Sequence, residues 1–185
     1  MILFGFSIFI DKFPKFKPHK KHKKYKHHIR IMKTYELFIT LIKFKTHNMI
    51  ITKTILKELV YQVNGAAIEV HKALGPGLLE SVYHKCMKKE LQYLGISFQS
   101  ELSVPVYYKG LEIDTELRCD LFVENILPVE LKAVEYILPV HEALIITYMK
   151  LLNVSKGLMI NFSVKHIFKE GQRTFVNEIY RDLPE

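Results

Sequence analysis

Apolar residues recur every three or four positions from Ile55 to Leu74, and this spacing predicts a helix with one buried stripe. A second run with the same period extends from Leu79 to Leu94 and predicts another helix. The sequence Gly-Pro-Gly at positions 75–77 separates the two runs, and Gly95 is a natural stop for the second. The first part of the folded region is therefore predicted to be a helical hairpin.

The apolar period then falls to two, which is typical of β-strands. Residues 102–108 alternate between apolar and other side chains, and Lys109-Gly110 turns the chain into a second strand over residues 113–123. Glu124-Asn125 turns it again into a third, more buried strand over residues 126–134. These three strands predict an antiparallel meander.

The remaining pattern predicts a helix over residues 140–152, an interior strand over residues 157–162 and a last strand over residues 174–180. The element order is therefore ααβββαββ. Such an order predicts an α/β domain in which helices flank a mixed β-sheet.

The charge is distributed very unevenly along the chain. The formal net charge is +8, and residues 1–48 contain 12 of the 27 basic residues but only 2 of the 19 acidic ones. Residues 49–185 therefore hold 15 basic and 17 acidic residues, a balance of −2. We predict one domain over residues 49–185, preceded by a basic and disordered extension over residues 1–48.

Two interpretations of the extension stay open. Its lysines and aromatic residues are suited to an arm that lies on nucleic acid. The alternative is an extension of no consequence that is translated from upstream of a start at Met49, where periodic sequence begins.

The cysteine content and hydropathy predict a cytoplasmic protein. Cys86 and Cys119 are too far apart for a redox or zinc pair, so we expect two reduced thiols. There is no run of 18 apolar residues, and the apolar first ten residues have no basic residues before them. Neither a membrane span nor a signal peptide is expected.

Three charged residues in the predicted meander are candidates for chemistry. Glu130 and Lys132 lie two positions apart in an apolar strand, so both side chains face the same side of the sheet. Asp120 lies ten residues earlier, where a hairpin would bring it beside Glu130. Two carboxylates held that close repel each other unless a cation lies between them, and oxygen ligands suit Mg²⁺ or Mn²⁺ better than zinc.

A cation at this point predicts phosphodiester hydrolysis. It would polarise a phosphate oxygen and lower the pKa of a water molecule, while Lys132 would position that water or stabilise charge on the phosphate. The structural alternative is a buried salt bridge between Glu130 and Lys132, or two side chains that reach solvent from an edge strand.

Several motifs in the same order resemble the GxxExxY family of small proteins, which belongs to the PD-(D/E)XK nuclease superfamily. The motif that names the family corresponds to residues 77–83, Gly-Leu-Leu-Glu-Ser-Val-Tyr. The similarity continues through residues 104–110, 118–121, 129–134, 141–143 and 157–162 and Arg173, and it covers essentially all of residues 49–185.

The resemblance implies a restriction-endonuclease-like core and assigns roles to particular residues. Asp120 and Glu130 would bind Mg²⁺ or Mn²⁺ together with the carbonyl of Leu131, and Lys132 would be the catalytic lysine. Glu80 would complete the site as a catalytic residue and a further metal ligand, although the sequence alone favours an exposed helix acid.

The resemblance also bears on the substrate and on one departure from the family pattern. The family usually has Gln after His-Glu-Ala, where this chain has Leu144, while Tyr148 is retained as a residue expected to bind substrate. The substrate would be a nucleic acid, with DNA favoured over RNA. The oligomeric state is open, with a homodimer among the alternatives.

Three functions compete at this stage. The first is a metal-dependent nuclease, and the second is a nucleic-acid-binding or assembly module that keeps the fold with little or no catalysis. Leu144 and the nearly neutral domain favour the second. The third is a hydrolase of a small phosphorylated compound. Of the four histidines in residues 49–185, His141 is the one near the expected site in sequence, and none is assigned a catalytic role.

Overall fold

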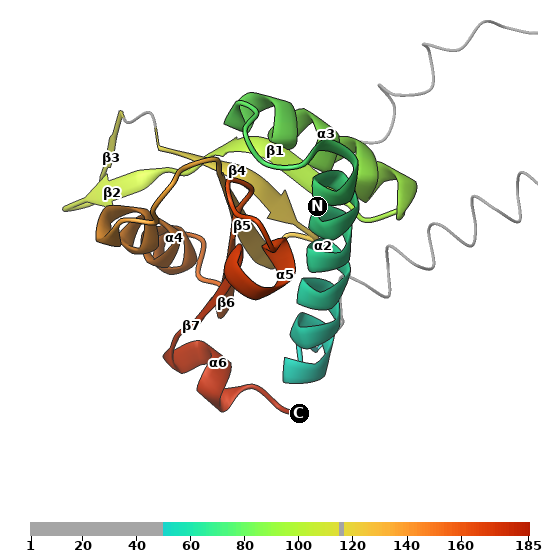
Figure 1. Cartoon of the computed structure of the whole chain (residues 1–185). Coiled ribbons are helices and arrows are strands. Elements are labelled where there is room, and N and C mark those ends of the chain that lie inside the picture. Colours follow the sequence, from blue (N-terminus) through green and yellow to red (C-terminus); the bar gives the residue numbers. More distant parts are fainter. Residues whose placement is uncertain (1–49, 115–116) are drawn as a thin grey trace, which may run out of the picture. The chain divides into compact units, whose positions relative to one another are not determined.

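A computed structural model of the chain describes residues 50–114 and 117–185, and Ile51–Glu185 form one compact unit. The extension predicted over residues 1–48 lies outside the described residues. In chain order the helices and strands are α2 (Lys53–Leu74), α3 (Glu80–Tyr93), β1 (Phe98–Ser103), β2 (Val106–Tyr108), β3 (Leu111–Ile113), β4 (Arg118–Val123), β5 (Leu127–Lys132), α4 (Pro139–Leu151), β6 (Lys156–Asn161), α5 (Ile167–Glu170), β7 (Gln172–Val176) and α6 (Glu178–Asp182) (Figure 1).

The strands form a five-stranded sheet in the order β1-β4-β5-β6-β7, and β2 and β3 form a separate two-stranded hairpin. β5 and β6 are parallel, whereas the other neighbouring strands are antiparallel. The parallel pair requires a crossover, which α4 supplies. The predicted class, an α/β fold with a mixed sheet flanked by helices, is confirmed.

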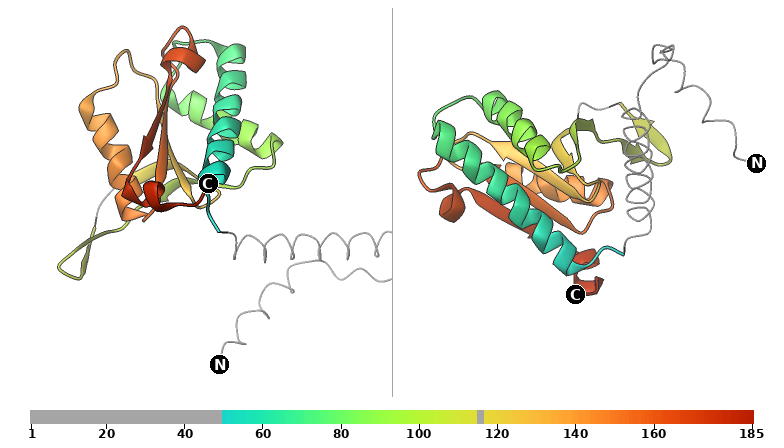
Figure 2. Two further views of the ribbon diagram at one scale, coloured as in Figure 1. Left: turned by 90° about the horizontal axis from the view of Figure 1, so that it is seen from below. Right: turned by 90° about the vertical axis from the view of Figure 1, so that its right-hand side faces the viewer.

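Helices cover both faces of the five-stranded sheet (Figures 1 and 2). On one face, α2 and α3 bury apolar side chains against alternate residues of β5 and β6, such as Val129 and Ile160. Tyr83 of α3 is completely buried there and stacks on Phe162 with ring centroids 4.4 Å apart. On the other face, Ile145 and Tyr148 of α4 pack with Met159 of β6. None of the described helices is long and apolar enough to cross a membrane.

The strand boundaries differ from the predicted ones at three places. The chain leaves the large sheet after Ser103, because Pro105 has no N–H to donate to a ladder, and β2 and β3 form their own hairpin. The predicted strand over residues 113–123 is therefore divided between β3 and β4. The last strand ends at Val176, because the side chain of Asn177 accepts the Tyr180 N–H and starts α6.

The close approach of β6 to α4 gives a testable prediction on stability. A Cβ atom at Gly157 would lie 2.9 Å from Ile145 Cγ1 and 2.9 Å from Met149 Sδ. Gly157→Ala is expected to lower the free energy of unfolding by about 1–3 kcal/mol. Gly65→Ala is the control, since its Cβ meets nothing within 4 Å inside α2, and it should stabilise by roughly 0.5–1 kcal/mol. Urea denaturation measures both, and an unchanged Gly157→Ala midpoint would contradict this packing.

Candidate active site

The candidate site lies where β4 begins and β5 ends. The antiparallel register pairs Leu121 with Val129, so the next residues outward, Asp120 and Glu130, come side by side. The Oδ2 atom of Asp120 accepts the backbone N–H of Leu131 at 2.8 Å. The expected neighbouring positions of the two acids are therefore observed, and this end is called the site end of the sheet below.

A local distortion of the edge strand lies directly opposite Asp120. The paired residues of β1 and β4 skip Glu101 and Asp120, and Glu101 has a positive φ of 52°. This left-handed conformation interrupts the pairing at one residue on each strand, without an inserted residue. Cys119 packs in the cluster that contains Ile145 and Tyr148 of α4. Leu121, two positions later, packs in the cluster that contains the buried residues of α2 and α3.

Glu130 is an almost fully buried carboxylate with one unsatisfied oxygen. Its residue exposure is 3%, and Oε1 accepts from Lys132 Nζ at 2.7 Å. Its other oxygen, Oε2, is buried and has no hydrogen-bond partner among the described residues. Burial and the nearby charge of Asp120 raise the pKa of Glu130 to about 7, although Lys132 acts in the opposite direction. Glu130 is therefore a buried carboxylate with only one of its two oxygens hydrogen-bonded.

Lys132 stays protonated in this environment. Burial disfavours its charged form, but the hydrogen bond and the charge of Glu130 outweigh that effect and raise the pKa of Lys132. Its Nζ also donates to the Leu131 carbonyl at 2.9 Å. Lys132 can therefore act as a charged hydrogen-bond donor rather than as a proton acceptor.

Glu80 reaches the site from the first turn of α3. Its Oε1 atom lies 3.8 Å from Lys132 Nζ, and its Oε2 accepts the Ala133 N–H at 3.3 Å. The preceding turn is fixed by the buried Tyr83 hydroxyl, which donates to the Gly75 carbonyl at 2.7 Å and accepts the Leu78 N–H at 3.1 Å. The structure thus brings Glu80 together with Lys132, as the sequence motif led us to expect.

His84 contacts the site, although the sequence pattern indicated His141 as the histidine close to it along the chain. His84 Nε2 lies 3.1 Å from the Asp120 carbonyl oxygen and 3.2 Å from Ser100 Oγ. It lies one turn after Glu80, and this i, i+4 spacing on the predicted helix was the available signal. His141 instead accepts the Leu138 N–H at the start of α4 through Nδ1.

Tyr148 and Leu144 lie on α4 against the sheet. The structure places Tyr148 in the core, with 2% exposure, and its hydroxyl donates to the Arg118 carbonyl. Burial raises its pKa, and the charge of Glu130 adds to the effect. Leu144 is partly buried in the same apolar cluster. Both residues pack against the start of β4 on the α4 face of the sheet. A direct substrate contact by Tyr148 stays a prediction.

The donor atoms at the site fit a hard divalent cation. Among the described residues, no three His, Cys, Asp or Glu side chains are close enough to hold a metal ion together. Asp120 and Glu130 are two carboxylates with the Leu131 carbonyl beside them, and Glu130 Oε2 lacks a partner. Mg²⁺ is often held by one or two carboxylates while water fills its other positions. The residues present therefore fit Mg²⁺ or Mn²⁺.

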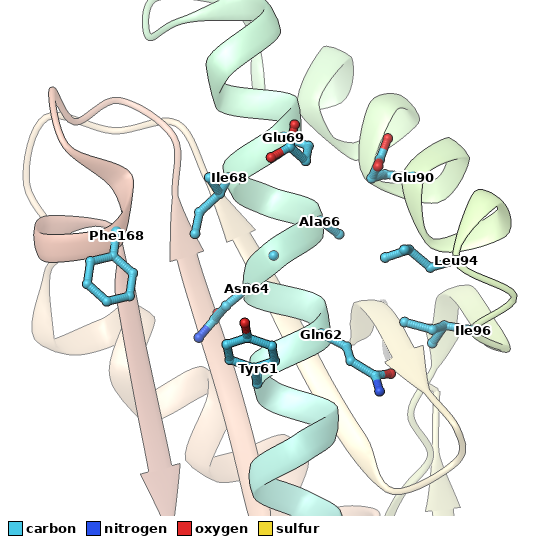
Figure 3. Close-up of a pocket in the computed structure, with 11 residues that line it drawn as sticks. Tyr61, Gln62, Asn64, Ala66, Ile68, Glu69, Glu90, Leu94, Ile96 and Phe168 are labelled. Atoms are coloured by element: carbon cyan, nitrogen blue, oxygen red, sulfur yellow. The ribbon is translucent and has the colours of Figure 1, made fainter.

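A separate groove, lined by residues of α2 and of the C-terminal end of α3, is chemically different from this site (Figure 3). It has a volume of about 570 Å³ and is lined by apolar residues, the amides Gln62 and Asn64 and the acids Glu69 and Glu90, without a basic residue. Glu90 lies ten residues beyond Glu80, which corresponds to about 15 Å along a helix. This groove is therefore no part of the carboxylate site, and its charge disfavours phosphate.

Two carboxylates and a protonated lysine at one end of a mixed sheet are typical of metal-dependent enzymes that cleave phosphodiesters. The family model described as the PD-(D/E)XK nuclease superfamily matches residues 57–174, and the chain belongs to this superfamily. The searches of curated proteins and of solved structures found no match.

Proposed function

We propose that the protein is a Mg²⁺- or Mn²⁺-dependent nuclease that hydrolyses phosphodiester bonds. The observation that carries this proposal is the buried Oε2 atom of Glu130, which lacks a partner beside Asp120. An unpaired buried carboxylate oxygen costs free energy in the folded protein, and a divalent cation would offset that cost.

The residues of the site divide the work. Asp120, Glu130 and the Leu131 carbonyl would hold the cation, and Glu80 would act near it at the edge of the site. A bound divalent cation lowers the pKa of water and polarises a phosphate oxygen. Lys132, protonated and fixed by Glu130 at 2.7 Å, would orient the water or offset the negative charge that develops on the phosphate.

The finer assignments are part of the same proposal. The motif at residues 77–83 supports membership of the GxxExxY group, and Glu80, which this motif contains, lies at the site. We propose that the substrate is a nucleic acid, with DNA favoured over RNA. We also propose that the protein is cytoplasmic. The two free thiols, Cys86 and Cys119, suit a reducing compartment.

The experiment measures cleavage by the purified full-length chain. Labelled single- and double-stranded DNA and RNA are incubated with Mg²⁺, Mn²⁺ or EDTA. We expect products with either metal and none in EDTA, and Asp120→Asn should lower the rate by about 10²-fold or more. Asp182→Asn, which changes an exposed acid on α6, is the control and should cleave normally. Products in EDTA, or full activity of Asp120→Asn, would overturn the proposal.

A second candidate function is a nucleic-acid-binding or assembly module with little catalysis. The salt bridge between Lys132 and Glu130 favours it, because the ammonium already compensates one oxygen of that carboxylate. The apolar Leu144 favours it as well. Binding of nucleic acid that survives Asp120→Asn, without products at any metal concentration, would select this candidate.

A further inference from the structure

The β2–β3 hairpin projects from the body of the domain (Figures 1 and 2). It connects the end of β1 to the start of β4, where Ser103 pairs with Arg118. Arg118 is two residues from Asp120 along β4. The hairpin therefore emerges from the site end of the sheet.

The base of the hairpin is fixed, whereas its strands pair only with each other among the described elements. Val104 is 1% exposed and packs with Cys119, Ile145 and Tyr148. Its N–H donates to the Leu117 carbonyl at 2.9 Å. A two-stranded hairpin has little stability of its own, so this base sets its direction.

One face of the hairpin is apolar and exposed. The register pairs Val106 with Ile113 and Tyr108 with Leu111, so these four side chains share a face, and Tyr107 and Glu112 share the other. Tyr108 is 63% exposed and Leu111 is 70% exposed. Gly110, with a φ of 81°, forms the tight turn with Lys109.

Lys109 adds a cation to this face. Its Nζ lies 5.3 Å from the centroid of the Tyr108 ring, within the range of a cation–π interaction. An exposed aromatic ring with a neighbouring cation is the combination on which proteins stack unpaired bases. The single acid of the two strands, Glu112, points to the opposite face, where the Tyr107 hydroxyl lies 3.4 Å from it.

We propose that the face formed by Val106, Tyr108, Leu111 and Ile113 binds the unpaired bases of a single strand whose phosphodiester lies at the carboxylate site. This inference rests on the proposed nuclease function and names the form of its substrate. From Val104 to Tyr108 the chain spans about 13 Å, which is roughly four stacked nucleotides. Only unpaired bases expose their rings for stacking on Tyr108.

The test measures binding by the full-length chain, with Lys132→Ala present in every protein to prevent cleavage. A labelled 20-nucleotide single strand and the matching duplex are titrated in Mg²⁺. Tyr108→Ala should weaken single-strand binding by about tenfold and duplex binding by less than about twofold. Tyr108→Phe keeps the ring and should bind as the parent does, the parent being the chain with Lys132→Ala alone. Tyr93→Ala removes a tyrosine that is 82% exposed on α3 and should also have no effect.

Three results of the binding assay would overturn the inference. They are parent-like binding by Tyr108→Ala, an equal loss for single strand and duplex, and no binding of either by the parent. A Tyr108→Ala variant that changes from dimer to monomer by light scattering would also overturn it, because a second copy would then cover the face. Failure of the nuclease proposal is distinguishable, since it appears as a lack of metal-dependent products from the wild-type chain in the cleavage assay, while the loss of binding caused by Tyr108→Ala persists.

Discussion

Lys132→Ala should lower the rate of nucleic-acid cleavage by about 10³-fold while binding of nucleic acid persists. The reason is that Lys132 carries the positive charge nearest to both Glu130, at 2.7 Å, and Glu80, at 3.8 Å. Its raised pKa keeps that charge in place at neutral pH. Initial rates in Mg²⁺ for the variant and the wild type measure the effect.

The same substitution removes a structural bridge, so a second variant is needed. Lys132→Gln keeps an amide that can donate to Glu130 and to the Leu131 carbonyl, but it has no charge. We expect Lys132→Gln to restore the melting temperature and to remain as inactive as Lys132→Ala. Lys57→Ala, which removes an exposed lysine of α2, controls for the loss of one charge. Recovery of full activity in Lys132→Gln would mean that Lys132 has only a structural role.

Glu130→Gln should make the metal-free protein more stable at pH 8, by about 1–3 kcal/mol. At that pH the wild type must keep a charged carboxylate buried, with one oxygen unpartnered. Gln is neutral and of similar size, so the cost of burying a charge disappears.

The pH dependence of this effect follows from the raised pKa of Glu130, about 7 in the folded protein against an ordinary value of 4.5. The folded state holds the proton more tightly than the unfolded state, so this group favours folding below pH 4.5. That contribution is lost as the pH rises through 7. In EDTA the two proteins should therefore be nearly equally stable near pH 4.5 and differ most above pH 7.

Metal should reverse the order of stability. Mg²⁺ or Mn²⁺ should raise the melting temperature of the wild type at pH 8 and leave that of Glu130→Gln unchanged, because the variant keeps only one of the two charged ligands, Asp120. Glu124→Gln changes a half-buried turn carboxylate at the other end of β4 and keeps an oxygen that can accept the Ser97 N–H, so it should respond to metal as the wild type does. If Glu130→Gln is less stable than the wild type in EDTA at pH 8, the unpaired oxygen of Glu130 does not lower the free energy of unfolding as we infer.

The sequence was sufficient to predict the fold class and the close approach of Asp120, Glu130 and Lys132. Period-two alternation placed Glu130 and Lys132 on one side of a strand, and a short hairpin placed Asp120 beside them. These features depend on local periodicity and on one tight turn, which a sequence displays directly. The motif at residues 77–83 also indicated Glu80, which comes from a distant helix.

Other features depend on tertiary contacts that no local pattern contains. The positive φ of Glu101 occurs inside β1, opposite Asp120 of β4, and no turn residue in the sequence predicts it. The contact of His84 with the Asp120 carbonyl requires α3 to lie across β4. The burial of Tyr148 likewise depends on how α4 packs on the sheet. Sequence spacing alone therefore identified the charged groups but not the residues that hold them in place.

The most direct test of the central claim is binding of Mn²⁺ to the full-length chain, measured by electron paramagnetic resonance. This measurement needs no knowledge of the substrate, and it addresses the carboxylates themselves. We predict that the wild type binds Mn²⁺ and that both Asp120→Asn and Glu130→Gln lose this binding, while Asp182→Asn keeps it. Binding that is absent from the wild type, or unchanged in Asp120→Asn and Glu130→Gln, would contradict the assignment of Asp120 and Glu130 as a metal centre.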